Sequence, residues 1–181
     1  MTQEEAVQRR NRSLEELANR INRDYYDVIS RLISQIKERA QNIKENGSSE
    51  TTLTYLALCD QLLDELKIYI DRRKLFFMPY INELAEKSID NHNCDNCSGR
   101  CGLKHSSKLL EFIESLKHIN STVCNMMAAI LLEHRVNSEE LIMLHTEMMS
   151  LDSLVNDLLY NEETHLLPHI IDDQKSIHAH E

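Results

Sequence analysis

The sequence predicts an all-α fold, an up-down-up-down four-helix bundle, on three observations. Apolar residues recur every three or four positions over long stretches, which is the period of an amphipathic helix. The chain of 181 residues contains only 3 Gly and 2 Pro, and so few helix-breaking residues favour long helices. Polar breaks leave two short connections and a longer middle one, a pattern typical of a bundle whose successive helices alternate in direction.

The first two helices are predicted over residues 13–45 and 50–89. Ser13 begins a capping box at the start of the first helix. The first helix ends at Asn46-Gly47-Ser48-Ser49, a run typical of a turn. Pro79 lies inside the second helix, and because proline lacks a backbone N–H, we expect it to kink or break that helix.

The last two helices are predicted over residues 106–134 and 138–172. A polar segment at 90–105 contains two of the three glycines and is expected to be a Cys-rich loop before the third helix. Asn137 and Glu140 have the spacing of a capping box that opens the fourth helix. The sequence therefore predicts four helices of comparable length.

The domain is expected to be one bundle over residues 13–172, between an N-terminal tail at 1–12 and a C-terminal tail at 173–181. The polar C-terminal tail is predicted to be frayed. A single domain of this length buries a substantial core.

Charge and cysteine content restrict the partners and the compartment. The net charge of −10 argues against nucleic acid and against an anionic membrane surface, because both require clustered Lys and Arg. No apolar run approaches the ~20 residues that span a bilayer, and the N-terminus lacks the apolar core of a signal peptide. We therefore expect a cytoplasmic protein. The sequence identifies no protein partner and is compatible with a homodimer.

The five cysteines are an odd number in a chain without an export signal, so they are interpreted as thiols or metal ligands rather than disulfides. Two of them, Cys59 and Cys124, lie within predicted helices and are expected to be small core residues.

Two segments resemble each other about ninety positions apart, at residues 69–81 and 158–170. In each, charged residues lead into a short apolar run, then Pro, then Ile two residues later. Positions four apart lie on one helix face, where a His and a carboxylate would hold a metal in a bundle core. In this chain these positions carry Tyr69 and Arg73 in the first segment, and Leu158 and Glu162 in the second.

Several short motifs occur in the same order along the helices. They are Leu14-Glu-Glu-Leu-Ala-Asn-Arg-Ile21 with Asp24-Tyr25-Tyr26, Phe77-Met-Pro79, Lys117-His118 and Leu167-Pro168. In order and spacing, most of residues 13–172 resembles the bacterial hemerythrin-like iron–sulfur-cluster repair proteins. The resemblance implies a four-helix bundle that binds two irons and repairs iron centres damaged by nitric oxide or peroxide under stress.

Most of the iron ligands that the resemblance implies are replaced in this chain. The corresponding positions are Tyr26 (or Tyr25), Tyr69, Arg73, His118, Leu158 and Glu162, of which only His118 and Glu162 keep a ligand type. Each iron would need about five or six donors, whereas Arg is always protonated and Leu has no donor. We therefore expect a degenerate di-iron site without metal. A mononuclear ion on His118, Glu162 and a tyrosine, or an intact di-iron centre, are the alternatives.

Arg73 and Glu162 are expected to have replaced the metal with an ion pair inside the bundle. The resemblance implies two glutamates that face each other across the irons at these positions. Without iron such carboxylates would repel each other, whereas a paired charge is tolerated in the core. Tyr26, Tyr69 and His118 are predicted to surround this pair. The alternative is an Arg73 side chain that points to solvent, as most Arg side chains do.

A second candidate metal site lies in the Cys-rich segment. Cys94 and Cys97 form a Cys-x-x-Cys pair, and Cys101 follows with His105 four residues later. Three cysteines with His105, or His92 in its place, would make a tetrahedral zinc site. An iron–sulfur cluster, a redox-active dithiol and cysteines without a ligand role are the alternatives.

Two classes of function follow from these features. The first is a non-catalytic hemerythrin-like module that carries a structural or sensory metal in the Cys-rich loop. The second is a working iron-binding protein for the repair of oxidatively or nitrosatively damaged iron–sulfur clusters.

Overall fold

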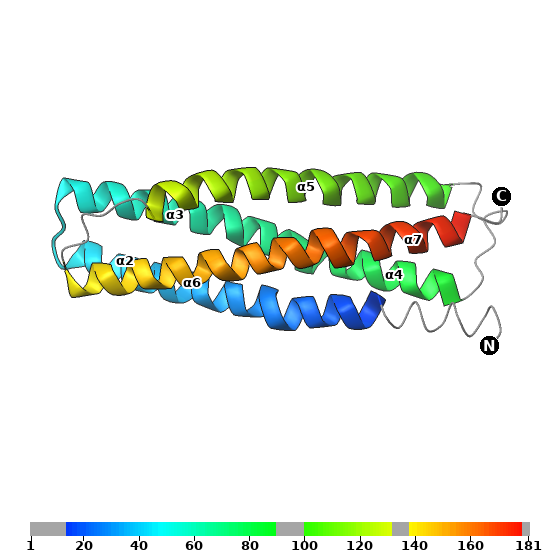
Figure 1. Cartoon of the computed structure of the whole chain (residues 1–181), viewed down its shortest axis with the longest axis horizontal. Coiled ribbons are helices and arrows are strands. Elements are labelled where there is room, and N and C mark those ends of the chain that lie inside the picture. Colours follow the sequence, from blue (N-terminus) through cyan, green and yellow to red (C-terminus); the bar gives the residue numbers. More distant parts are fainter. Residues whose placement is uncertain (1–13, 90–99, 132–137, 179–181) are drawn as a thin grey trace.

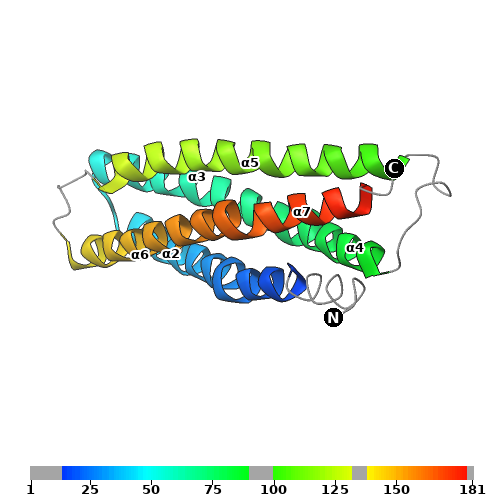
Figure 2. The ribbon, with the colours of Figure 1, turned by 45° about the vertical axis from the view of Figure 1, so that its right-hand side comes forward.

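A computed structural model describes residues 14–89, 100–131 and 138–178, and nearly all of them are helical. Four long helices lie side by side, and each runs back along the one before it (Figures 1 and 2). Within the described ranges there is no β-strand, so the predicted all-α four-helix bundle is confirmed. None of these helices is long and apolar enough to cross a membrane.

Within the described residues, three of the four helices contain a five-residue π turn, which is wider than the α-helix around it. The first helix comprises α-helical residues 14–21, the π turn η1 (Asn22–Tyr26) and α2 (Asp27–Glu45). The second comprises α3 (Glu50–Arg72), η2 (Arg73–Phe77) and α4 (Met78–Ile89). The third is α5 (Arg100–Leu131), and the fourth comprises α6 (Glu139–Asn161), η4 (Glu162–Leu166) and α7 (Leu167–His178).

The two prolines follow two of these π turns directly. Pro79 is the second residue of α4 and Pro168 the second residue of α7. In a regular α-helix the proline ring would press on the carbonyl four residues earlier, a clash that a wider turn relieves. Both helices therefore continue through their proline rather than breaking at it.

Serine hydroxyls begin two of the helices. Ser49 accepts a hydrogen bond from the Thr52 N–H at 3.2 Å, which satisfies a donor that α3 cannot pair internally. Ser138 does the same for the Leu141 N–H, also at 3.2 Å. The predicted cap at Asn137 is therefore wrong by one residue.

Two further boundaries differ from the prediction. Helix α5 begins at Arg100, so the last part of the expected loop at 90–105 is helical. Helix α7 continues to His178, so the tail predicted from residue 173 is wrong for its first six residues. Asp173 and Gln174 are buried at helical spacing from Ile170. The sequence prediction missed this extension because the buried residues that continue the period are polar.

One continuous core runs along the bundle. Helix α2 packs on α3 and α6, and α5 packs on α3, α6 and α7. The second and fourth helices also touch directly, through α4 and α7. The core is almost entirely apolar, and the charged residues buried in it, among those that the structure describes, are Arg73, Glu162 and Asp173.

Candidate functional site

The predicted ion pair between the second and fourth helices is present in the core. Arg73 opens the π turn η2 and Glu162 opens η4, and both side chains are 0 % exposed. The Arg73 Nη2 lies 3.0 Å from the Glu162 Oε2, and its Nε lies 3.2 Å from Oε1. The guanidinium thus meets both carboxylate oxygens, the geometry of a strong charge-assisted contact.

Two tyrosines complete the hydrogen bonding of the carboxylate. The Tyr26 hydroxyl, from the first helix, donates to the Glu162 Oε1 at 2.5 Å. The Tyr69 hydroxyl donates to Oε2 and accepts a hydrogen bond from the Arg73 Nη2 at 2.8 Å. Three helices therefore converge on one carboxylate, and each of its oxygens has donors from two side chains.

Aromatic rings and the third helix enclose the other side of the guanidinium. The Arg73 Cζ lies 3.8 Å from the centre of the Phe112 ring and 4.7 Å from that of Phe77, close enough for cation–π attraction. The Arg73 Nη1 donates to the Ser115 hydroxyl at 2.9 Å. The pair is thus held by side chains from all four helices.

The surroundings of the site raise the pKa of both tyrosines and of Arg73, which keeps the phenols neutral and the guanidinium charged. Burial, then the negative charge of Glu162, raises the pKa of Tyr26 and of Tyr69 well above the usual value for a phenol. For Arg73, burial lowers the pKa, but the charge of Glu162, its hydrogen bond and the two tyrosines together more than offset burial, so the pKa is raised overall. At neutral pH the guanidinium is therefore charged and the two phenols are neutral.

The predicted role of His118 is wrong. Its side chain is 68 % exposed, and its nearest acid is Glu65 at 3.9 Å. The third helix faces the core through Phe112, Leu116 and Ile119, and the polar contact to Arg73 comes instead from Ser115. His118 lies roughly 120° around the helix from Phe112, taking about 100° per residue.

Of the other positions that the resemblance selects, some contact the Glu162 carboxylate and others do not. Tyr26, rather than Tyr25, faces the carboxylate, while the Tyr25 hydroxyl accepts a hydrogen bond from the Asn161 amide at 3.1 Å. Leu158 is buried and has no donor to offer. Of the six positions, Tyr26, Tyr69, Arg73 and Glu162 form one hydrogen-bonded cluster.

The donor set of this centre does not fit two irons. It offers one carboxylate and two phenols without an imidazole, and a guanidinium lies where a cation would need to approach. Over the ranges that the structure covers, no three His, Cys, Asp or Glu side chains gather in a way that could hold a metal ion. The hydrogen bonds and the ion pair of the cluster connect all four helices through the core.

The Cys-rich candidate site lies mostly outside the described residues. Cys94, Cys97 and His92 are not among them, and α5 carries Cys101 and His105 at positions one helical turn apart. Of the two cysteines predicted in the core, Cys59 is buried, and this burial raises the pKa of its thiol to about 12.

Ser115, Phe112 and the π turns were not predicted. Ser115 lies between Phe112 and Leu116, two buried residues of the third helix, and this spacing places it beside the core. The π turns have a weak signal in the two prolines, each six residues after a buried charge.

Comparison of the chain with models of protein families, with curated proteins and with solved structures gives no match.

Proposed function

We propose that this chain is a non-catalytic hemerythrin-like module in which a buried ion pair replaces a di-iron centre. The observation that carries the proposal is the fully buried Arg73–Glu162 pair, with Tyr26 and Tyr69 on the same carboxylate. These side chains occupy the positions at which the resembling family of iron–sulfur-cluster repair proteins carries its iron ligands. The ion pair then does mechanically what a metal would do, linking the second helix to the fourth through the core.

The chemistry of the cluster supports a structural role. A permanent cation beside the carboxylate opposes binding of a metal cation, since the two compete for the same oxygens. Every oxygen of Glu162 already accepts hydrogen bonds, and the two phenols are held neutral. A metal would have to displace Arg73 into a wall of aromatic rings, which is costly for a charged group.

Metal analysis of the chain purified without oxygen tests the proposal. We expect no stoichiometric iron and no oxo-bridge absorption band. Adding ferrous iron is expected to leave the thermal midpoint unchanged, because a site that binds no metal gains no stability from it. Two irons per chain, lost in Glu162→Gln, would instead establish the alternative, a working iron protein of the repair type.

A second proposal concerns a structural or sensory zinc in the Cys-rich segment. The observation that favours it is that residues 101 and 105 lie one helical turn apart along α5. Cys94 and Cys97 would supply the remaining thiolates of a tetrahedral site, with Zn–S distances of about 2.3 Å.

Zinc quantitation separates this second site from the first. We expect one zinc per chain, lost in the Cys94→Ser/Cys97→Ser variant and retained in Arg73→Met. Cys59→Ser is the matched control, because Cys59 is buried within α3 and is expected to leave the zinc content unchanged. A zinc-free chain prepared under reducing conditions would contradict this proposal without touching the first.

A further inference from the structure

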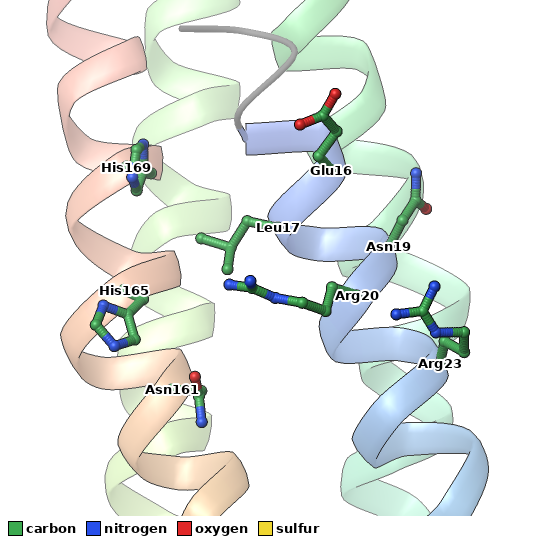
Figure 3. Close-up of a pocket in the computed structure, with 8 residues that line it drawn as sticks. All are labelled: Glu16, Leu17, Asn19, Arg20, Arg23, Asn161, His165 and His169. Carbon is green, nitrogen blue, oxygen red and sulfur yellow. The ribbon is translucent and has the colours of Figure 1, made fainter.

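A groove separates the start of the first helix from the π turn of the fourth. It has a volume of about 680 Å³ and is lined by Glu16, Leu17, Asn19, Arg20, Arg23, Asn161, His165 and His169 (Figure 3). This volume is in the range of sites for small molecules, about 300–1,000 Å³. All of the lining residues except Leu17 are polar, so the groove is not an apolar docking face.

Cationic and hydrogen-bond-donating side chains from two helices face each other across this groove. Arg20 extends from the first helix toward the fourth, while His165 and His169 lie one turn apart on the fourth (Figure 3). The groove's own carboxylate, Glu16, points away from them in the same view. Arg23 is not available in the same way, because it pairs with Asp24 at 2.7 Å.

Arg20 differs from other cations of the first helix. Arg39 forms a two-pronged contact with Glu147 on α6, with both distances 2.8 Å, and Lys37 and Lys44 each reach an acid on α3. In the described part of the chain, Arg20 forms no ion pair with an acid on a neighbouring helix, and a carboxylate with which it interacts is Asp24, one turn along its own helix. In a chain of net charge −10, an arginine directed at two histidines is an arrangement that an added anion would neutralise.

Asn161 adds the ability to distinguish ligands. Both hydrogens of its amide are already engaged, with the Tyr25 hydroxyl at 3.1 Å and the Asp157 carbonyl at 2.8 Å. Its position in the wall is therefore fixed, and its remaining polar atom is an acceptor. A ligand with a hydroxyl group next to its anionic group would satisfy both Asn161 and Arg20.

We propose that this groove binds the phosphate or carboxylate group of a small anionic molecule, with Arg20 as the principal contact and His165 and His169 as further donors. The site is separate from the buried Arg73–Glu162 pair and does not depend on the function proposed for it. Arginine is suited to this role because its planar donors match both kinds of oxyanion.

Titration of the full chain with sodium phosphate and with sodium succinate, followed by amide NMR shifts, tests the proposal. Sodium chloride at equal ionic strength serves as the blank. We expect saturable shifts in residues around Arg20 and His165 with at least one of the two oxyanions. Binding by only one would assign the class of ligand, phosphate or carboxylate, and binding by both would assign oxyanions in general.

Variants make the test specific. Arg20→Gln is expected to weaken oxyanion binding about tenfold, the effect of one lost hydrogen bond to a charged group. His165→Gln is expected to weaken it less. Arg72→Gln is the matched control, since Arg72 is also exposed but lies outside the groove. Shifts that chloride reproduces, no saturable binding of either oxyanion, or equal losses in Arg20→Gln and Arg72→Gln would overturn the proposal.

Discussion

The second and fourth helices share one backbone design and differ in the chemistry of a few side chains. When the two sequences are aligned with an offset of 89 residues, many of their buried positions coincide. Apolar pairs buried in both include Tyr55/Leu144, Cys59/Met148, Leu62/Leu151, Leu66/Val155, Ile70/Leu159, Phe77/Leu166 and Ile81/Ile170. The same shift places η2 on η4 and Pro79 on Pro168.

The differences lie where the two helices meet. The same shift pairs Arg73 with Glu162, Tyr69 with Leu158 and Leu84 with Asp173. The π turn and its proline thus present a buried side chain to the bundle centre in both helices, whatever that side chain is. The position of the buried side chain is therefore set by the backbone that the two helices share, whereas its chemistry is set by the few residues that differ between them.

The largest expected effect comes from removing one of the two opposite charges. Arg73→Met and Glu162→Leu are each expected to cost about 3–5 kcal/mol of unfolding free energy, because the remaining charge is left buried without its partner. The double variant is expected to be more stable than the sum of the single effects predicts, as packed apolar groups often replace a buried pair without loss. Denaturant unfolding of all four proteins measures this coupling.

If the loss of unfolding free energy in the double variant equals the sum of the two single losses, the two side chains are not coupled and the ion-pair account is contradicted. Arg39→Met is the control, since its contact with Glu147 is only half-buried and exposed pairs contribute about 0.2–1 kcal/mol.

High pH is expected to weaken the centre through its tyrosines. Their pKa values are raised in the folded state, so above pH ~10 the unfolded chain loses phenol protons that the folded chain retains. The contribution of each to stability is therefore complete below that pH and declines above it, by up to about 1.4 kcal/mol per pH unit. Unfolding free energies between pH 8 and 11 measure the slope, and Tyr26→Phe is expected to reduce it.

Tyr160→Phe is the control for this pH dependence, because Tyr160 is 61 % exposed. A slope that Tyr160→Phe reduces as much as Tyr26→Phe would show that the buried phenols are not its source.

At neutral pH the two tyrosines are expected to differ. Tyr69→Phe removes a donor to Glu162 and an acceptor for Arg73, whereas Tyr26→Phe removes only a donor. Hydrogen bonds to charged groups contribute about 1.5–3 kcal/mol, so both variants are expected to be destabilised, Tyr69→Phe more than Tyr26→Phe. Thermal unfolding at pH 7 ranks them, and the reverse order would show that Arg73 does not depend on the Tyr69 hydroxyl.

The smallest effect distinguishes two residues of the third helix. Ser115→Ala is expected to cost about 0.5–1.5 kcal/mol through the lost hydrogen bond from Arg73. His118→Ala is expected to change stability by less than about 0.5 kcal/mol, since its side chain is largely exposed. A larger effect at His118 would restore the position that the resemblance gives it.

Much of the fold was predictable, because helix boundaries depend on local signals. The ends expected at residues 45, 50 and 89 agree with the structure, where α2 ends at Glu45, α3 begins at Glu50 and α4 ends at Ile89. The extension of α7 was missed because Asp173 and Gln174, although buried, do not show an apolar period.

The candidate site was predictable where it depended on helix order and failed where it depended on helix rotation. The order and spacing of the segments were sufficient to bring Arg73 to Glu162. They were insufficient to choose between Ser115 and His118, because that choice depends on which face of the third helix turns inward. The apolar spacing of Phe112, Leu116 and Ile119 contained this information, whereas a motif match to Lys117-His118 did not.

The placement of the pair along the chain has a consequence for biosynthesis. Arg73, with its two tyrosines, belongs to the first half of the chain, and Glu162 belongs to the second, 89 residues later. As the chain leaves the ribosome, the first two helices would have to bury a guanidinium whose counter-ion is not yet synthesised. The centre of the first hairpin is therefore expected to close only after the fourth helix has emerged, so that completion of the bundle follows synthesis of Glu162.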